Sequence, residues 1–321
     1  MINKIALVGL GVIGKIHLKL LIENPNWDLV GIYDIDKVLC KDIATQYNLK
    51  AFESLEEAIE HAEVLDIVTT TNSHFEIAKQ AIINGKHVFI KKPVSENIKE
   101  AKTLQNYITE AGICFQVGHS DRYNPAFIAA KPYLNEPKYI EVERLAQYNQ
   151  KGSEVSVVLD LMMNELDLIL SIVKSNIKKI HVSGCNLVGK TADIINARIE
   201  FENGCVANIT TNRMAFRNTR KFAVYTDEHF VNINLLDKIT EVVKVKNAEQ
   251  NSKNLTVDPG KGFAKKEINF EHPIILPTNA INQELNAFHD SINSNKKPVF
   301  GIDEAIILLD LAIEIEENLI L

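Results

Sequence analysis

The stretch Ile5-Ala6-Leu7-Val8-Gly9-Leu10-Gly11-Val12-Ile13-Gly14 decides the fold of the first third of the chain. Its first four residues form an apolar run typical of a buried strand, and its last six have the spacing G-x-G-x-x-G. A helical pattern follows to Ile22, and a second strand pattern, Leu29–Tyr33, ends at the acidic Asp34. This order predicts a dinucleotide-binding βαβ unit. Glycines that serve tight turns alone are the alternative interpretation.

Each glycine of the motif has an expected task at a bound dinucleotide. Gly9 allows a tight turn, Gly11 lets the backbone approach a pyrophosphate, and Gly14 lets the helix pack on the strand. The N–H groups and the positive dipole end of the helix N-terminus attract the anion. We therefore assign Val12 and Ile13 to the same cofactor-binding site.

The acidic residues after the second strand indicate which dinucleotide fits. Asp34 would accept hydrogen bonds from the adenosine ribose diol, and together with Asp36 it disfavours a 2′-phosphate. No Arg follows Asp34, although Lys37 keeps NADP open as an alternative. We therefore expect NAD as the cofactor, with NADP as the second choice.

The chain changes character near residue 120. Before this point strands and helices alternate, which predicts a Rossmann doubly wound parallel sheet over residues 1–120. After it, strand patterns dominate and Asn203-Gly204 marks a hairpin, which predicts a C-terminal α/β domain with a large open, mostly antiparallel sheet over residues 121–321. The expected strands of this second domain are Tyr139–Leu145, Lys179–Cys185, Asp193–Phe201, Cys205–Thr211, Phe222–Tyr225, Phe230–Asn234, Thr240–Val245 and Glu267–Phe270. Helices are expected at 157–173, 281–294 and 303–318, and a polar surface loop at 247–265.

Composition and charge exclude several classes of protein. The 321 residues are 46% hydrophobic and 24% charged, which fits two folded domains and not a disordered chain. The net charge of −7 argues against a general nucleic-acid binder. No apolar run approaches the roughly 18 residues of a membrane helix, and the N-terminus is a poor signal peptide, so we expect no membrane partner and a cytoplasmic protein. The four cysteines lie far apart and predict neither a metal site nor a disulfide framework.

A second candidate site is Lys91-Lys92-Pro93, at the end of the strand pattern His87–Ile90. Ligands bind at the carboxyl ends of parallel strands. A lysine placed there can take a proton from a substrate hydroxyl as a hydride leaves the same carbon, provided that its pKa is lowered. Two solvated lysines at a strand end are the alternative.

These motifs together resemble the Gfo/Idh/MocA family, named for glucose–fructose oxidoreductase and inositol dehydrogenase. Besides Gly9 to Gly14 with Asp34, three stretches carry the resemblance. They are Thr69-Thr70-Thr71-Asn72-Ser73-His74, which resembles T-P-x-x-x-H; Gly85-Lys86-His87-Val88-Phe89-Ile90-Lys91-Lys92-Pro93, which resembles G-K-H-V followed by two apolar residues and E-K-P; and Asp160-Leu161-Met162-Met163-Asn164-Glu165-Leu166-Asp167, which resembles D-x-x-x-H-D-x-D. The segments 118–125 and 158–162 resemble the UDP-N-acetylglucosamine 3-dehydrogenase-like branch.

The resemblance implies a nicotinamide-dependent oxidoreductase that acts on a sugar, sugar nucleotide or cyclitol. Lys92 would be the proton-handling lysine and would also touch the cofactor. Thr69 and Thr71 would line the cofactor cleft, and Asp160 and Asn164 would face the substrate. The remaining residues expected near the substrate are His119, Arg122, Tyr123, Arg217 and Arg220. The C-terminal sheet would support a homo-oligomer, either a dimer or a tetramer.

Four positions depart from the family pattern. Lys91 stands where Glu is usual, Thr70 where Pro is usual, Asn164 where the catalytic His is usual, and Glu165 where Asp is usual. An Asn can orient a hydroxyl but cannot accept a proton. Two alternatives to a working dehydrogenase therefore stay open: an NAD-binding protein with impaired or no activity, and redox-neutral NAD-dependent glycosidase chemistry.

A basic cluster between two expected strands contains Arg213, Arg217, Arg220 and Lys221. It is interpreted either as a clamp for an anionic substrate, through Arg217 and Arg220, or as a salt-bridged surface or oligomer contact. His74 is interpreted as a capping or packing residue.

Overall fold

The computed structural model describes residues 1–149, 155–188, 191–249 and 254–319, which form two compact units. Unit 1 comprises Met1–Ser120 and Asn279–Asp310, and unit 2 comprises Asp121–Thr278 and the chain from Leu311 onward. The sequence patterns predict one domain over all of 121–321. Residues 279–310 instead return to unit 1, because Leu285 and Phe288 are buried in its core beside Trp27.

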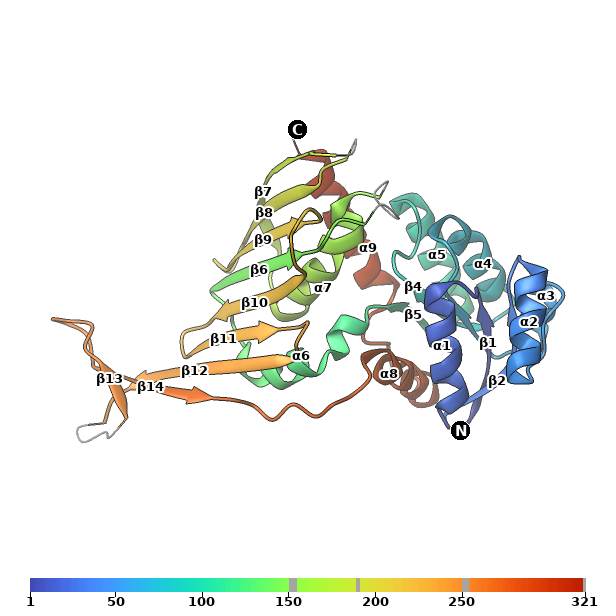
Figure 1. Cartoon of the computed structure of the whole chain (residues 1–321), viewed down its shortest axis with the longest axis horizontal. Helices are drawn as coiled ribbons and strands as arrows, with labels where there is room; N and C mark the ends of the chain where they lie inside the picture. Colours follow the sequence, from blue (N-terminus) through green and yellow to red (C-terminus); the bar gives the residue numbers. More distant parts are fainter. Residues whose placement is uncertain (150–154, 189–190, 250–253, 320–321) are drawn as a thin grey trace. The chain divides into compact units, whose positions relative to one another are not determined.

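Unit 1 is built on a five-stranded sheet whose strands are all parallel (Figure 1). The strand order is β2-β1-β3-β4-β5, so the order reverses between β1 and β3. The strands are β1 (Asn3–Val8), β2 (Trp27–Tyr33), β3 (Val64–Ile67), β4 (His87–Lys91) and β5 (Phe115–Gly118). The predicted Rossmann architecture is confirmed, and the point of reversal is where such sheets bind ligands.

Helices cover both faces of this sheet. Right-handed crossovers place α1 (Val12–Glu23) on one face and α4 (Thr71–Ile83) and α5 (Ile98–Ala111) on the other. Helix α8 (Ala280–Ser294) lies beside α1, because Asn24 donates hydrogen bonds to Asn282 and Asn286 at 2.8 Å. The connection from β2 to β3 contains α2 (Lys37–Tyr47) and α3 (Leu55–His61).

The local sequence explains where several of these helices begin and end. Ser54 accepts a hydrogen bond from the Glu57 N–H and so caps α3, as the capping-box spacing predicts. Gly112 ends α5 in the left-handed conformation at φ 62°. The sequence analysis named no helix at α2, which begins where the Asp36 side chain accepts from the Leu39 N–H.

Unit 2 is built on a nine-stranded sheet in the order β13-β14-β12-β11-β10-β6-β9-β8-β7. Its strands are β6 (Tyr139–Leu145), β7 (Ile177–Cys185), β8 (Ile194–Phe201), β9 (Val206–Asn212), β10 (Thr219–Tyr225), β11 (His229–Asn234), β12 (Ile239–Asn247), β13 (Leu255–Val257) and β14 (Lys266–Glu271). The β6–β9 pair is parallel and the other pairs are antiparallel. The predicted mostly antiparallel sheet is confirmed.

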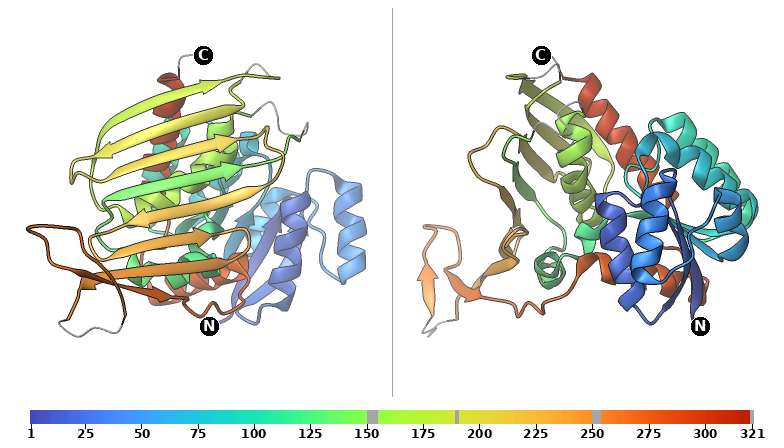
Figure 2. Two further views of the ribbon diagram at one scale, coloured as in Figure 1. Left: turned by 60° about the vertical axis from the view of Figure 1, so that its left-hand side comes forward. Right: turned by 45° about the vertical axis from the view of Figure 1, so that its right-hand side comes forward.

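One face of this sheet packs against helices α6 (Pro125–Ala130) and α7 (Met163–Ile172) (Figure 2). Side chains that point to this face are buried, as in Ile195, Ala197 and Ile199 of β8. Over the described residues, the opposite face is covered by no helix (Figure 2). Because each strand has one buried face and one solvated face, apolar and polar residues alternate along it.

The structure corrects four details of the sequence analysis. Strand β13 lies inside the segment predicted to be a loop, because it pairs with β14. The helix expected at 157–173 begins as a π-helical turn, Val158–Met162, before α7. Arg220 and Lys221 lie within β10 and not between strands, because they pair with Arg144 and Glu143 of β6. The last helix, α9, is Ile302–Glu317. Among all helices in the described ranges, none combines the length and the apolar character that a membrane span requires.

Candidate functional site

The glycine motif forms the turn from β1 into α1. Gly9 has φ 103°, and a Cβ atom built there would lie 2.9 Å from the Thr69 N atom. A Cβ atom on Gly14 would lie only 2.1 Å from the Gly9 carbonyl oxygen, so the helix and the turn touch backbone to backbone. Gly11 differs, because a Cβ atom there would meet nothing within 4 Å. Two of the glycines are therefore required by packing, and the third leaves an open approach to the backbone.

The N-terminus of α1 is open to an anion. Gly11 is its N-cap, no side chain of the described residues caps it, and its first turn contains no acidic residue. Val12 is 80% exposed and Ile13 is 37% exposed, which is unusual for large apolar side chains. Unbonded helix N–H groups and the positive dipole end make this turn suited to a phosphate group.

Asp34 lies beside this turn at the end of β2. Its Oδ2 atom accepts a hydrogen bond from the Leu10 N–H at 2.6 Å, and its Oδ1 atom accepts from the Asp36 N–H at 2.9 Å. Each carboxylate oxygen can accept a further hydrogen bond, so the fixed Asp34 can still bind a diol. Lys37 is engaged elsewhere, because its Nζ atom donates to the Glu53 carbonyl at 2.6 Å and lies 4.2 Å from the centre of the Tyr33 ring.

His74 connects the chain segments that follow β3 and β4. Its Nδ1 atom lies 2.8 Å from the Pro93 carbonyl oxygen and its Nε2 atom 3.2 Å from the Thr69 carbonyl oxygen. Burial lowers the pKa of His74, while the two hydrogen bonds oppose that effect. Lys92 precedes Pro93 through a cis peptide bond and is half-buried. The arrangement fits the packing role expected for His74, and it fixes the backbone next to Lys92.

The other expected residues of unit 1 lie at the same sheet edge. Thr69 accepts a hydrogen bond from the Ser73 hydroxyl at 2.8 Å, and Thr71 is the half-buried first residue of α4. His119 follows β5, is 4% exposed, and its backbone N–H donates to the Glu284 carboxylate. The His119 ring packs on Phe300, with the ring centres 4.1 Å apart. Packing thus fixes the His119 ring in unit 1.

The polar residues around α7 are of two kinds. Asp160, in the π-helical turn, is exposed and Asn164 is half-buried, whereas Asp167 is buried. Asp167 binds Arg122, whose Nη2 atom lies 2.6 Å from its Oδ1 atom. The spacing of positions 160, 164 and 167, four and then three residues, predicts one helical face and a shared pocket. Asp167 is thus engaged by Arg122, and a pocket shared by the three positions stays a prediction.

Two arginines of the basic cluster make internal ion pairs. Arg220 donates from Nε to Glu165 at 2.6 Å and from both Nη atoms to Asp121 at 2.7 Å. Arg213 donates to Asp193 at 2.7 Å. Burial acts to raise the pKa of Asp193, but hydrogen bonds from the Val188 and Leu187 N–H groups and from Arg213 outweigh it and lower the pKa to about 2.

Arg217 is the exposed arginine of the cluster. It lines a pocket of about 260 Å³ at one end of β10 and β11, whose other lining residues are Asn218, Thr219, Arg220, Lys221, Asn234, Leu236 and Asp237. The neighbouring Phe216 is fully exposed. Arg217 and Lys221 are therefore the cations of this cluster that face solvent.

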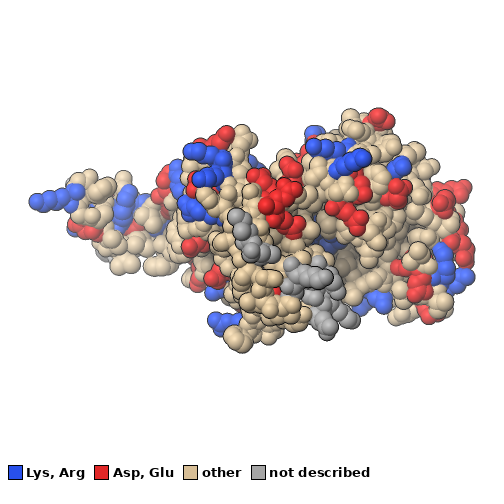
Figure 3. All heavy atoms as spheres, turned by 90° about the horizontal axis from the view of Figure 1, so that it is seen from above, with Lys and Arg blue, Asp and Glu red and all other residues tan. Residues whose placement is uncertain are grey.

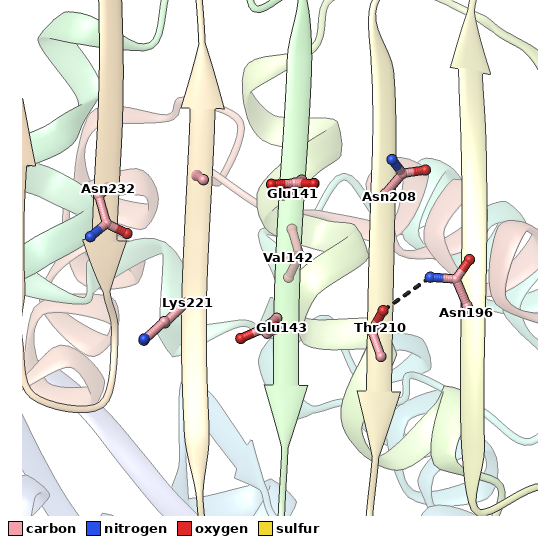
Figure 4. Close-up of a pocket in the computed structure, with 9 residues that line it drawn as sticks. Glu141, Val142, Glu143, Asn196, Asn208, Thr210, Lys221 and Asn232 are labelled. Atoms are coloured by element: carbon pink, nitrogen blue, oxygen red, sulfur yellow. Dashed lines mark hydrogen bonds between the residues drawn. The ribbon is translucent and has the colours of Figure 1, made fainter. Parts of the chain in front are cut away.

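A shallow trough of about 510 Å³ lies on the uncovered face of the nine-stranded sheet (Figure 4). We call it the outer trough. Its lining residues come from five adjacent strands and are Glu141, Val142, Glu143, Asn196, Asn208, Thr210, Lys221, Ala223 and Asn232. Lys221 lies directly opposite Glu143 in the β10–β6 register, so charges of both signs share the trough.

Within the described ranges, no group of three or more His, Cys, Asp or Glu side chains is arranged to hold a metal ion.

On the face seen in Figure 3, Lys and Arg side chains lie among Asp and Glu side chains, and neither sign covers that face. The exclusion of nucleic acid stays a prediction.

One candidate residue was missed by the sequence analysis. Ile35 follows Asp34 directly and is 88% exposed, so it offers an apolar surface next to the carboxylate that would bind a ribose. An isoleucine in the loop after the acidic residue is the signal that could have identified it.

Comparison with known proteins supports this picture. Residues 3–119 match the family model described as an oxidoreductase family with an NAD-binding Rossmann fold. UDP-N-acetylglucosamine 3-dehydrogenase from Acidithiobacillus ferrooxidans is 26% identical over 240 residues, which cover 73% of this chain and 75% of that protein. The scyllo-inositol 2-dehydrogenase (NAD(+)) from Bacillus subtilis is 32% identical over 130 residues, which cover 39% of this chain and 38% of that protein.

A solved structure of the Acidithiobacillus ferrooxidans UDP-N-acetylglucosamine 3-dehydrogenase is also similar. It has a TM-score of 0.89 at 22% identity and covers 99% of this chain and 98% of its own. At this identity the likeness shows a common fold along nearly the whole chain.

The contrast between Gly14 and Gly11 gives a stability test. We expect Gly14→Ala to lower the free energy of unfolding by at least about 3 kcal/mol, because backbone atoms cannot move away from the new methyl group. Gly11→Ala, whose methyl group meets open space, should change it by no more than about 1 kcal/mol. Urea unfolding measures both variants, and equal losses would contradict the packing argument.

Proposed function

We propose that the chain is a nicotinamide-dependent dehydrogenase of the Gfo/Idh/MocA oxidoreductase family, whose NAD-binding Rossmann model matches residues 3–119. It transfers a hydride between the cofactor and the hydroxyl or keto carbon of a sugar, sugar nucleotide or cyclitol. The observation that carries the proposal is the open helix N-terminus at Gly11, with the fixed Asp34 carboxylate beside it. The relatives that act on a sugar nucleotide and on an inositol support this class of substrate.

The cofactor would be held by the C-terminal edge of the five-stranded sheet. Gly11, Val12 and Ile13 would offer their N–H groups to the pyrophosphate, while Gly9 and Gly14 shape the turn. Asp34 would accept hydrogen bonds from the adenosine ribose, and Ile35 would offer an apolar surface to the adenine. Thr69, Thr71 and Lys92 line the nicotinamide end of the same edge. Bound NAD supplies the hydride acceptor.

Lys92 handles the proton of the reaction. Oxidation of a carbinol removes a hydride from carbon and a proton from the hydroxyl, and the neutral Lys92 amine takes that proton at Nζ. Asn164 orients the hydroxyl through its amide, since an amide cannot accept the proton itself. The other residues proposed to serve the substrate are His119 of unit 1 and, in unit 2, Asp160, Arg122, Tyr123 and Arg217. The Arg217 guanidinium, exposed beside its pocket, suits an anionic substituent of the substrate.

Turnover tests this assignment. Purified protein should reduce NAD with at least one member of a panel of sugar nucleotides, sugars and cyclitols. We expect Lys92→Ala to lower kcat by a factor of about 100 to 10,000, because general base catalysis contributes that much. Its NAD affinity should change far less.

The exposed Lys102 of α5 provides a matched lysine control, and Lys102→Ala should keep wild-type kcat. A wild-type protein that binds NAD but oxidises nothing in the panel would instead support the binding protein with impaired activity, as the Asn164 departure allows. Release of a sugar without net NADH would support the redox-neutral alternative.

We also propose that the cofactor is NAD and not NADP. The ribose 2′-position would face the Asp34 carboxylate, which repels a phosphate, and Lys37 is held by Glu53 and Tyr33. We expect wild-type protein to bind NADH at least about tenfold more tightly than NADPH. Asp34→Ser should reduce that ratio, whereas Asp42→Ser, on the exposed side of α2, should leave it unchanged. Equal affinities for both cofactors in the wild type would refute this preference.

The nine-stranded sheet is the proposed oligomer interface, in a dimer or a tetramer. The outer trough contains carboxylates and an ammonium group side by side, so a two-fold related copy can place Lys221 against Glu141 or Glu143. Beside it, the rings of Tyr225 and Phe230 stack with their centres 4.6 Å apart.

Substitution in the middle of the outer trough tests this interface. Ala223 is a small trough residue, so Ala223→Arg should block close approach of a second sheet and shift the assembly toward monomers. Light scattering after size exclusion measures the mass. Glu110→Arg, on the exposed surface of α5, should keep the wild-type mass. A monomeric wild type, or an unchanged mass for Ala223→Arg, would remove the proposal.

A further inference from the structure

Arg220 joins two carboxylates from different elements of unit 2. Its Nη1 and Nη2 atoms hold both oxygens of Asp121 at 2.7 Å, and its Nε atom holds the Oε1 atom of Glu165 at 2.6 Å. The side chain of Arg220 is 11% exposed and that of Glu165 is fully buried. Paired guanidinium–carboxylate contacts of this length fix the orientation of both groups.

A second arginine also lies close to the carboxylate of Glu165. Arg144 of β6 lies directly opposite Arg220 in the β10–β6 register, so two guanidinium groups point to the same buried face. The Arg144 Nε atom is 3.8 Å from the Oε1 atom of Glu165, which stands close to both cations. Burial and the charge of Arg220 lower the pKa of Arg144. Glu165 and Asp121 therefore balance two positive charges that would otherwise repel each other across the strands.

Helix α7, which contains Glu165, is attached at a second point by the residue that follows Asp121. Arg122 follows Asp121, and its guanidinium binds both oxygens of Asp167 at 2.6 to 3.0 Å. Asp121 and Arg122 belong to the short 3-10 helix Ser120–Tyr123. Both acidic partners on α7, Glu165 and Asp167, lie within three residues of Asn164, and Glu165 follows it directly.

The start of α7 is a junction between two helical geometries. The helix continues directly from the π-helical turn Val158–Met162. Asn164 is the second residue of α7, immediately after the change of helical geometry. Its amide can orient a substrate only if the helix backbone at this junction is fixed.

We propose that Arg220 is a positioning residue, which fixes the start of α7 and thereby Asn164 by binding Asp121 and Glu165 at the same time. This inference rests on the proposed dehydrogenase function, in which Asn164 orients the substrate hydroxyl. It replaces the sequence-based role of Arg220 as a clamp for an anionic substrate. Arg217, three residues earlier and exposed, keeps that role.

The same substitution at the two arginines separates positioning from clamping. A lysine keeps the charge but cannot span two carboxylates as a guanidinium does. We expect Arg220→Lys to lower kcat about tenfold to 100-fold, with anionic and with neutral substrates alike, because a small misplacement of an orienting group has that effect. Arg217→Lys should keep kcat within about twofold and raise KM for the anionic substrate alone.

The inference is overturned if Arg220→Lys keeps wild-type kcat, or if it raises KM for the anionic substrate alone. Should Arg220→Lys fail to fold, Asp121→Asn removes the charge of one partner and should show the same loss of kcat. A wild type without turnover would instead refute the proposed function. In that case hydrogen exchange tests the positioning role of Arg220 independently of turnover. Arg220→Lys should speed exchange of the backbone amides in residues 163–167, and unchanged exchange would overturn the positioning role.

Discussion

The packing of Gly14 on Gly9 shapes the candidate cofactor site of unit 1. Helix α1 can pack on the turn after β1 only because residue 14 lacks a Cβ atom, which would lie 2.1 Å from the Gly9 carbonyl. This contact aims the helix N-terminus along the sheet edge, where Leu10 binds Asp34. The contact between Gly9 and Gly14 thus places the helix N-terminus, and the pairing of β2 with β1 places Asp34 beside it.

Unit 2 uses buried charge in addition to apolar packing. The inner face of its sheet contains Arg144 and Arg220, and Arg213 follows β9 directly; each lies beside a carboxylate. A buried ion pair adds little net stability, because removing two charges from water offsets most of their attraction. The ion pairs instead provide packing specificity. Each arginine determines which carboxylate, and so which helix or loop, packs against it.

The sequence predicted most of the fold and the part of the site that depends on local order. Apolar runs and the glycine spacing act within a few residues, so β1 and α1 could be recognised. The return of 279–310 to unit 1 depends on Leu285 and Phe288 meeting Trp27, which no local pattern contains. The partners of Arg220 are equally distant, since Asp121 lies 99 residues away. The cluster of arginines in the sequence therefore suggested a surface clamp. In the fold, Arg213 and Arg220 form buried ion pairs, and Arg217 is exposed.

This division bears on the departure at position 164. An amide there cannot accept the hydroxyl proton as a base, so any dehydrogenase chemistry must route that proton through another group, and Lys92 is the candidate at the sheet edge. Asn164 then contributes through orientation alone. Orientation is sensitive to small backbone shifts in a way that proton affinity is not. A chain with Asn at this position depends more on the ion pairs that fix the start of α7 than a chain with a histidine would, because its amide acts only through where it points.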